Sequence, residues 1–441
     1  MDDFIAARSQ MALSLGFHII FACIGMIMPF FMAISHYLYL KKRNDHYRKL
    51  TVAWSKGVAI FFVTGAVSGT MLSFELGLLW PEFMLHAGPI FGMPFSLEGT
   101  AFFLEAIAIG FFLYGWGKFH PWFHWYTGVM VGVTGLASGI LVVAANGWMN
   151  APTGFDYVDG EFLNIDPMAA MFNDAWFTQA LHMTLAAFVA TGFAVAGIHA
   201  FLLMRGKNKP LHRSALKIAL SLGAVAAILQ PISGDISAKD VAQRQPAKLA
   251  AMEAHYHTES NAPLIIGGIP DEKNKIVNYA IKIPGGLSFL AHGDFNAEVI
   301  GLDQFPEDEQ PPVLITHLAF QIMVGCGMIL MLTGILWLFG QWRKKPFVEA
   351  KWFLTLLAFL TPLGFIAVEA GWVVTEVGRQ PWIIYGIMKT REGLTPMPGI
   401  VYSFWLYTFI YLSLCGIVSL LLIRQIQDLD KKETPLPTYP R

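Results

Sequence analysis

Nine long apolar runs constrain the fold of this chain more than any other feature of its sequence. A helix needs about 20 mainly apolar residues to cross a lipid bilayer. Such segments must be helices, because lipid offers no partner to backbone N–H and C=O groups. The runs cover residues 12–40, 54–79, 94–116, 122–146, 176–204, 214–234, 314–340, 352–376 and 401–424. We therefore predict an all-α integral membrane protein, a bundle of about nine transmembrane helices that forms a single membrane domain over residues 1–441.

The composition agrees with burial in lipid. Of the 441 residues, 55% are hydrophobic and only 14% are charged, whereas soluble domains have about 25% charged residues. The net charge of −1 gives no electrostatic reason to bind nucleic acid. The lipid bilayer is the expected surrounding, and no nucleic-acid partner is expected.

The loops between the apolar runs predict the orientation in the membrane. Basic residues are concentrated in the odd-numbered loops: Lys41, Lys42, Arg43, Arg48, Lys49, Lys118, Arg205, Lys207, Lys209, Arg213, Arg343, Lys344 and Lys345. Loops 80–93 and 147–175 contain no Lys or Arg. Because basic loops stay in the cytoplasm, we predict the N-terminus outside and the C-terminus inside. The long polar loop 235–313 then lies outside, and loops of this length are usually functional or disordered. The last twelve residues, 430–441, are expected to form a loose tail.

Several ionisable residues lie within the apolar runs, where each is a functional candidate by default. They are His18, Glu75, Glu98, Glu105, His182, Glu369 and Glu376. The predicted orientation places them in the outer half of the bilayer. A histidine in such a helix is either bonded to a neighbour in the core or a haem ligand through a neutral ring nitrogen. Met323 could supply a second haem ligand, although this chain has 20 methionines and core packing is the competing interpretation.

The carboxylates also allow two interpretations. Glu98 and Glu105 are seven residues apart and share one helix face, so they form either a buried hydrogen-bonded pair or part of a proton path. Ser138 and Asn146 on the next helix could extend such a path. Four other histidines have no companion ligands at a recognised metal spacing, and we predict that they are solvated: His120, His124, His255 and His257.

Several ordered motifs resemble subunit I of the cytochrome bd-type quinol oxidases. The most specific is GWVVTEVGRQPW at 371–382. The others are ARSQMALSLGFH (7–18), SLEGTAFFLE (96–105), VVAANGWMN (142–150), KLAAMEAHY (248–256) and FQIMVGCG (320–327). These segments run from the N-terminus to the eighth apolar run, and the number of helices agrees with the family.

The resemblance implies the cofactors and their ligands. His182 and Met323 correspond to the axial ligands of a low-spin haem b. His18 and Glu376 correspond to ligands of a high-spin haem b and a haem d, in an order that the resemblance leaves open. Whether haem b replaces haem d also stays open. Arg379 corresponds to an arginine near the haems, where a cation would offset propionate charge.

The resemblance also implies roles for five further residues. Glu98 corresponds to an acidic residue beside the haem pair, and Glu105 and Ser138 to parts of a proton route. Lys248 and Glu253 correspond to a quinol-interacting pair at the start of the long loop. These roles make loop 235–313 the expected quinol-binding loop on the extracytoplasmic side.

Two features depart from the family pattern. Gln321 stands two residues before the ligand methionine, where the family often has arginine. A cation near a haem stabilises the reduced state, so we predict a lower potential for the low-spin haem than in a relative with arginine. The long loop is the shorter of the family's two forms, so quinol affinity does not carry over.

The expected function is therefore that of an electrogenic quinol:O₂ oxidoreductase in a bacterial or archaeal cytoplasmic membrane. Quinol would be oxidised at the outer face and O₂ reduced to water with cytoplasmic protons, which builds a proton gradient without pumping. The resemblance implies a second membrane subunit, subunit II, and sometimes small single-helix subunits. One alternative is a membrane cytochrome b that passes quinol electrons to a partner without oxygen chemistry. A transporter would show two matching halves around a midplane site, and the sequence has no such repeat.

Overall fold

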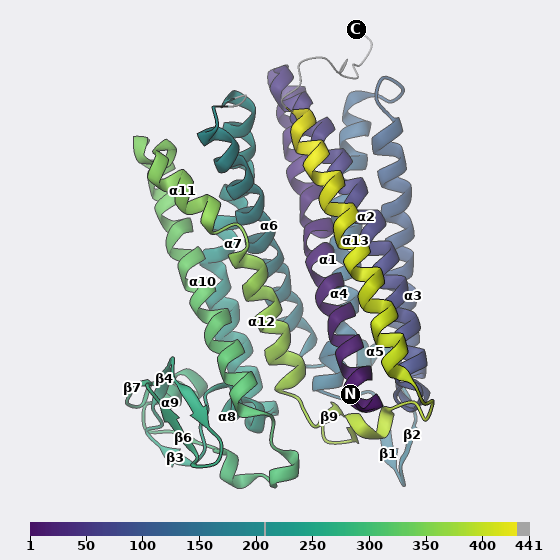
Figure 1. The fold of residues 1–441 in the computed structure, drawn as a ribbon, viewed down its shortest axis with the longest axis vertical. Coiled ribbons are helices and arrows are strands. Elements are labelled where there is room, and N and C mark those ends of the chain that lie inside the picture. The colour runs from purple at the N-terminus through teal and green to yellow at the C-terminus, as the bar shows by residue number, and fades with distance from the viewer. Residues whose placement is uncertain (207–208, 430–441) are drawn as a thin grey trace.

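The computed structural model describes residues 1–206 and 209–429 (Figure 1). Lys207 and the tail 430–441, which entered the predictions above, lie outside the described residues. Within the described residues, nine helical segments are long and apolar enough to cross a membrane. The predicted all-α membrane bundle is therefore confirmed.

The bundle consists of two groups of helices, which lie side by side in Figure 1. The first group contains α1 (Asp3–Lys42), α2 (Asp45–Leu79), α3 (Pro81–Tyr114), α4 (Pro121–Asn150) and α13 (Ile400–Leu429). The second contains α6 (Trp176–Met204), α7 (Lys209–Arg244), α10 (Val313–Trp342), α11 (Lys351–Phe359) and α12 (Leu363–Val377). Helices α1 and α4 both pack against α6 and so join the two groups.

Local sequence signals explain where several helices begin. The carboxylate of Asp2 caps α1 by accepting hydrogen bonds from the backbone N–H groups of Phe4 and Ile5. Helices α3 and α4 begin with Pro81 and Pro121. Proline suits a first helical position because the N–H that it lacks has no intrahelical partner there.

The apolar run 352–376 forms two helices rather than one continuous helix. Helix α11 ends at Phe359 and α12 begins at Leu363. Pro362 stands at the break, where it cannot donate the backbone hydrogen bond that a continuous helix needs. Together the two helices still cover the length of one membrane span.

Helix α7 continues ten residues beyond the end of its apolar run at residue 234. Two ion pairs with i,i+4 spacing lie along this extension, between Lys239 and Asp235 and between Arg244 and Asp240. Such pairs stabilise a polar helix. The first part of the predicted loop 235–313 is therefore helical.

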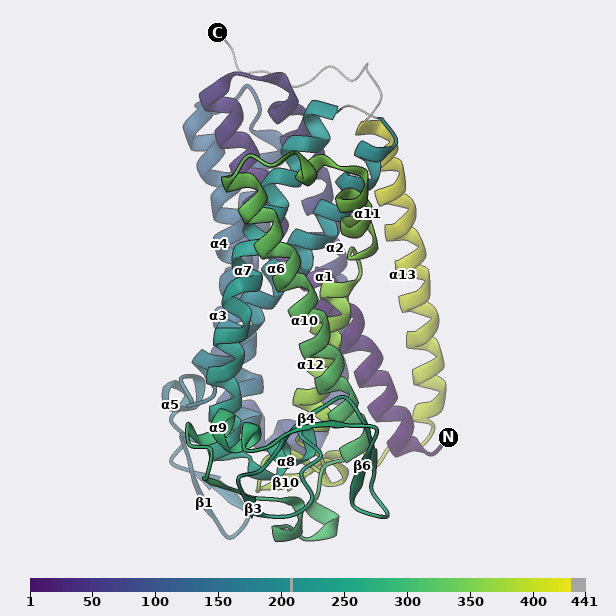
Figure 2. The same cartoon turned by 90° about the vertical axis from the view of Figure 1, so that its left-hand side faces the viewer.

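The rest of the long loop folds at one end of the bundle, which we call the loop end (Figures 1 and 2). It contains α8 (Pro246–Met252), α9 (Gly286–His292), and short 3₁₀ turns at Leu302–Gln304 and Glu307–Glu309. Three antiparallel strand pairs complete it: β3 (Glu259–Ser260) with β8 (Glu298–Val299), β4 (Leu264–Ile266) with β7 (Ile281–Ile283), and β5 (Ile269–Asp271) with β6 (Ile276–Asn278).

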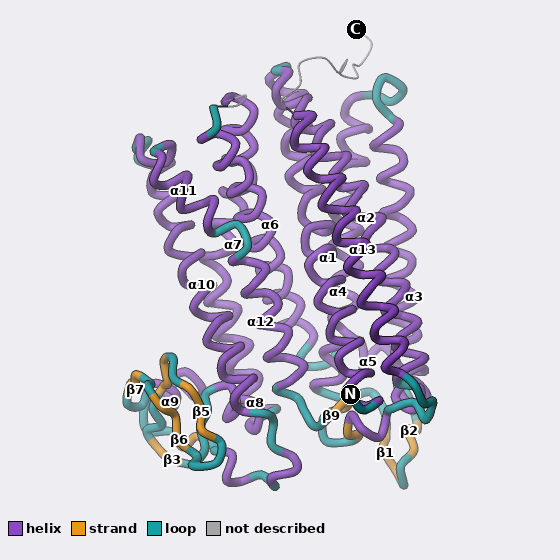
Figure 3. The backbone as a smooth tube through the Cα atoms, viewed as in Figure 1, coloured by secondary structure: helices purple, strands orange, loops and turns teal. Residues whose placement is uncertain are grey.

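Shorter elements connect the remaining helices at the same end (Figure 3). Strands β1 (Asp156–Val158) and β2 (Glu161–Leu163) and helix α5 (Pro167–Met171) lie between α4 and α6. Strands β9 (Trp382–Ile384) and β10 (Met388–Lys389) and the turn at Thr390–Gly393 lie between α12 and α13. The turn at Pro346–Glu349 joins α10 to α11 at the opposite end of the bundle. The N-terminus also lies at the loop end, whereas α13 ends at the opposite end of the bundle.

Candidate functional site

His182 lies in the second turn of α6 and is held by side chains of α7. Its Nδ1 is 3.0 Å from the hydroxyl of Ser233, and the amide nitrogen of Gln230 is 3.1 Å from its Nε2. Gln230 also donates to the backbone oxygen of His182. A second group that fixes one ring nitrogen and orients the other is typical of a ligand histidine. Gln230 would have to leave Nε2 before that nitrogen could bind iron.

Met323 lies on α10 and faces α12. Its sulfur would be 3.0 Å from a Cβ atom placed on Gly371, so the glycine makes room for the thioether. Helices α7 and α12 both pack against α10, and α12 also packs against α6. The helices that carry His182 and Met323, α6 and α10, both pack against α7 and α12. This arrangement suits two axial ligands of one haem, which must come from opposite sides of the same site.

His18 lies on α1 and is bonded to α2. Its Nδ1 is 2.9 Å from the hydroxyl of Ser68. A Cβ atom on Gly69 would come within 3.1 Å of the imidazole, so the glycine allows α2 to approach the ring closely. The bond to Ser68 occupies Nδ1 and leaves Nε2 as the nitrogen that could bind iron.

Glu376 belongs to a chain of hydrogen bonds that reaches the long loop. Its Oε1 accepts from the amide of Asn146 at 2.5 Å, and Asn150 donates to Asn146 at 2.9 and 3.1 Å. The ammonium group of Lys248 donates to Asn150 at 2.6 Å. One continuous network thus joins a predicted haem ligand to a predicted quinol residue. Asn150 had no predicted role, although its four-residue spacing from Asn146 in VVAANGWMN places both on one helix face.

Arg379 forms the other end of this network. Its NH2 group donates to Oε2 of Glu376 at 2.6 Å, and its side chain is only 2% exposed. Its Nε and NH1 atoms are buried and have no hydrogen-bond partner among the described residues. Unpaired buried donors on a cation suit an anionic group such as a haem propionate.

The chemistry of these side chains fits haem better than a bare metal ion. In the described parts of the chain, no three His, Cys, Asp or Glu side chains come together as they would around a metal ion. His18, His182, Met323 and Glu376 instead offer single ligands, each held by or packed against a neighbouring helix. Single axial ligands are what an iron already bound by a porphyrin requires.

The predicted proton-route residues lie between α3 and α4. Ser138 donates to Oε1 of Glu98 at 2.7 Å. The carboxyl group of Glu105 lies against Gly135, where a Cβ atom would be 3.1 Å from it, and Glu105 is only 7% exposed. Glu98 and Glu105 are close enough to interact electrostatically. The structure thus brings all three residues together on facing sides of two helices.

Lys248 and Glu253 are both buried at the loop end but form no ion pair with each other in the described structure. The pKa of Lys248 is lowered to about 7, mainly by burial and also by the charge of nearby Arg379, while Glu376 opposes the shift. Burial raises the pKa of Glu253 to about 8. Its Oε2 has no partner within residues 1–206 and 209–429. Both side chains therefore change protonation close to neutral pH.

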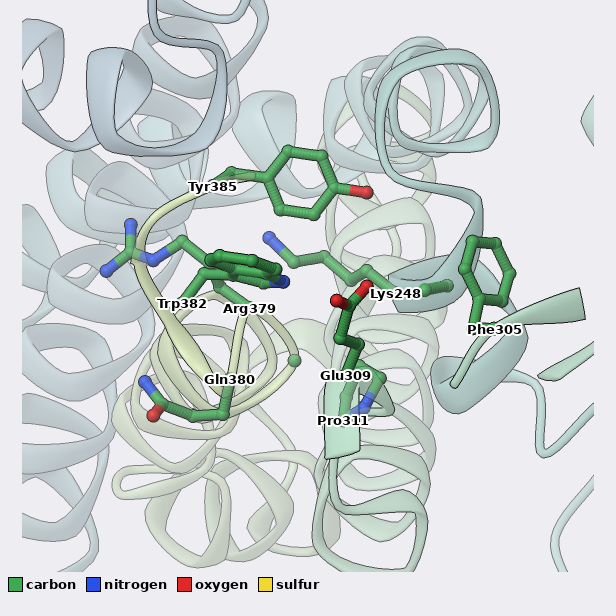
Figure 4. Close-up of a pocket in the computed structure, with 10 residues that line it drawn as sticks. Lys248, Phe305, Glu309, Pro311, Arg379, Gln380, Trp382 and Tyr385 are labelled. Carbon is green, nitrogen blue, oxygen red and sulfur yellow. The ribbon is translucent and has the colours of Figure 1, made fainter. Parts of the chain in front are cut away.

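A small cavity of about 30 Å³ lies beside Lys248 (Figure 4). Glu309, Trp382 and Tyr385 surround the Lys248 side chain there, and Arg379 lines the same cavity. Burial raises the pKa of Tyr385, and the charge of Glu309 adds to this effect. The cavity has room for one or two water molecules and is too small for a quinol ring.

Gln321 and His317 attach α10 to the long loop. Gln321 accepts a hydrogen bond from the N–H of Gly267 at 2.9 Å and donates to the oxygen of Ile265 at 3.0 Å. The ring nitrogens of His317 are 2.8 Å from the oxygen of Met252 and 3.1 Å from that of Gly267. Gln321, which the resemblance places where the family often has arginine, therefore uses both ends of its amide on the loop backbone.

Two of the four histidines predicted to be solvated are in fact buried. His124 has no exposed surface and its Nε2 is 2.7 Å from the oxygen of Phe112. His255 is 4% exposed and its Nε2 is 3.2 Å from the oxygen of Val299. Each imidazole is satisfied in its buried position by a hydrogen bond to a backbone carbonyl. Neither the spacing of these histidines nor their position in or beside a loop indicates such burial.

Comparison with known proteins identifies this arrangement of helices and side chains. The family model for cytochrome bd terminal oxidase subunit I matches residues 6–429. A Bacillus subtilis (strain 168) protein, provisionally named as a cytochrome bd menaquinol oxidase subunit I, is 36% identical, with 96% of each chain covered. The cytochrome bd ubiquinol oxidase subunit 1 of the same strain is 30% identical and covers 97% of this chain and 94% of the relative. The solved structure of the bd oxidase from Geobacillus thermodenitrificans has a TM-score of 0.91 and 38% identity, with 97% of this chain and 99% of that chain covered.

Proposed function

The chain belongs to the cytochrome bd terminal oxidase subunit I family and is a subunit of a quinol oxidase, and we propose that it oxidises quinol at its loop end and reduces O₂ within the bundle. The observation that carries the proposal is the hydrogen-bonded chain from Lys248 through Asn150 and Asn146 to Glu376. It joins Lys248, one of the two residues expected to meet quinol, to a residue expected to bind iron.

We assign the haem positions by ligand type. His182 and Met323 would hold a low-spin haem b, since His/Met ligation suits electron transfer. His18 and Glu376 would hold the high-spin haem b and the haem d, or a haem b in its place, with Arg379 facing the propionates. When bound, these groups supply the one-electron and oxygen chemistry, and the protein sets their ligation, spacing and surroundings.

Quinol oxidation would take place beside α8. Lys248 can donate a hydrogen bond to a quinol oxygen, and Glu253 can accept a quinol proton at its unpartnered Oε2. A proton acceptor works best when its pKa lies near the operating pH, and the pKa of Glu253 of about 8 meets this requirement. Protons accepted there would be released on the outer side.

The protons consumed in oxygen reduction would come from the cytoplasmic side. Glu105 lies deeper in the bundle than Glu98, by seven residues of α3 or ~10 Å at 1.5 Å per residue. A proton held at Glu105 can pass to Glu98, whose carboxylate is bonded to Ser138. The two proton sets have opposite origins, so charge separates across the membrane without a pump.

The proposal also states which side of the membrane the loop end faces and in which membrane the chain lies. The N-terminus and the loop end would face outward from a bacterial or archaeal cytoplasmic membrane, in agreement with the basic loops at the opposite end. A second membrane subunit, subunit II, would complete the oxidase, with small single-helix subunits in some assemblies.

A difference absorption spectrum, reduced with dithionite minus oxidised, tests the proposal on the purified complex with and without CO, together with haem extraction. We expect haem b plus a second haem that shifts with CO. Haem d would show as a chlorin, and CO-reactive haem b alone would indicate the haem-b form. The absence of any CO-reactive haem would disprove the oxygen-reducing function.

A further inference from the structure

A second polar cluster lies within the bundle, and the proposed quinol oxidation and proton uptake do not use it. Gln10 and Ser14 of α1, Glu75 of α2 and Tyr411 of α13 form this cluster, which we call the Glu75 cluster. Each of the four side chains is at most 2% exposed. Buried polar groups in a membrane-spanning bundle destabilise it unless they are satisfied, so they are retained mainly at functional sites.

The contacts within the Glu75 cluster leave too many hydrogen-bond acceptors. Oε1 of Glu75 accepts from the hydroxyl of Ser14 at 2.7 Å and from the amide of Gln10 at 3.3 Å. The buried Oε2 of Glu75 and Oε1 of Gln10 have no donor among the residues that the structure describes, and the Tyr411 hydroxyl, which is also buried without a partner there, could donate to only one of them. A proton on Oε2 would turn one of these two acceptors into a donor. The cluster therefore matches a site that binds a proton.

The aromatic hydroxyls of α13 complete the surroundings of Glu75. Tyr411 interacts with both Ser14 and Glu75, and Tyr407 interacts electrostatically with Glu75. These two tyrosines are the titratable groups that face Glu75 from α13, while α1 presents the neutral side chains of Gln10 and Ser14. Among the described residues, no ion pair joins a cation to the carboxyl group of Glu75.

The Glu75 cluster continues the polar seam that holds His18. On α1, Gln10, Ser14 and His18 are spaced four residues apart and so share one face. Ser14 is one turn from His18, ~6 Å along the helix. On α2, Glu75 and Ser68 are seven residues apart on one face, and Ser68 bonds His18. The carboxyl group, held by Ser14, therefore lies about one helical turn from the His18 position along the seam between α1 and α2.

We propose that Glu75 is a proton-binding site that takes up one proton when the metal centre at His18 accepts an electron. With haem bound at His18, the carboxylate would balance the extra positive charge of the oxidised iron. When reduction removed that charge, Oε2 would bind one proton from solvent, so one proton would accompany one electron. This inference rests on the proposed haem at His18.

Infrared difference spectroscopy on the intact oxidase complex tests the inference. The reduced-minus-oxidised spectrum should contain a carboxylic C=O band from Glu75. Glu75→Gln should abolish this band, and Glu75→Asp should keep it at a shifted frequency. Glu82→Gln is the matched control, because Glu82 is exposed at the start of α3, and it should leave the band unchanged. The midpoint potential of the His18 haem should depend less steeply on pH in Glu75→Gln than in the unmodified protein.

The remaining outcomes separate this inference from the proposed function. A band that persists in Glu75→Gln overturns the inference, provided that the absorption spectrum shows full haem content in the variant. A potential that follows the sodium concentration instead of pH also overturns it, because a cation would then occupy the cluster. If the unmodified protein bound no haem, the proposed function would fail, and infrared spectra recorded across a pH titration would still report protonation of Glu75.

Discussion

Asn146 donates a hydrogen bond of 2.5 Å to Glu376 and so joins α4 to α12 across 230 residues of sequence. Arg379 holds the second oxygen of the same carboxylate. With both oxygens engaged, Glu376 has a fixed position at the contact between the two groups of helices. Asn150 and Lys248 extend this arrangement to the loop end, so a change at Asn146 should affect both proposed sites.

Replacing Asn146 with alanine should weaken haem binding at Glu376. The variant loses a buried hydrogen bond to a carboxylate, which contributes about 1.5–3 kcal/mol, and we expect roughly a tenfold or greater loss of affinity for that haem. The ratio of high-spin haem to protein measures the effect. Asn296→Ala, at an exposed position of the loop, serves as the control, and equal haem content in both variants would contradict the prediction.

Glu253→Gln should remove the rise of quinol oxidation with pH. Burial raises the pKa of Glu253 to about 8, so this carboxyl group is mostly protonated at neutral pH. Only the ionised fraction can accept a proton from quinol, and this fraction grows as the pH rises. The rate should therefore rise from pH 6 to about 8 in the unmodified protein and stay flat in the variant. We expect kcat to fall about 10²–10⁴-fold. Glu259→Gln, an exposed position on β3, should keep the full profile, whereas a rise that persists in Glu253→Gln would exclude this carboxyl group as the acceptor.

The number of membrane helices was predictable because bilayer thickness alone sets the length of an apolar run. Helix ends and breaks that depend on ion pairs or on a proline were not predictable from the apolar runs. Helix α7 extends to Arg244 through ion pairs such as Lys239–Asp235, which hydropathy does not register. The break before α12 depends on Pro362, and a proline within an apolar run can either kink a helix or end it.

Sequence motifs indicated the candidate ligands but not the side chains that hold them. Ser68, Ser233 and Asn150 come from other helices or other turns, and their contacts depend on how the helices pack. Lys248 and Glu253 were expected to act as a pair. They are five residues apart around α8, which places them on faces about 140° apart, and the structure gives them separate surroundings.

His182→Ala and Met323→Ala should each abolish the low-spin haem signal and spare the CO-reactive haem. The reason is that each variant removes one of the two axial ligands proposed for that haem, while His18 and Glu376 remain in place. The difference absorption spectrum with and without CO measures both signals. His120→Ala, which changes a histidine exposed at the start of α4, is the matched control. An unchanged low-spin signal in either ligand variant would reject the assignment.

Gln321→Arg should raise the midpoint potential of the low-spin haem, because a cation near the haem stabilises its reduced state. The substitution also removes two hydrogen bonds from Gln321 to the backbone of Gly267 and Ile265, so a looser loop could change the potential as well. Gln321→Met separates the two effects, since methionine has a similar size, no charge and no amide. Redox titration should show a higher potential in Gln321→Arg than in Gln321→Met, and the KM for quinol should rise in both. Equal potentials in the two variants would mean that the charge at position 321 does not tune this haem.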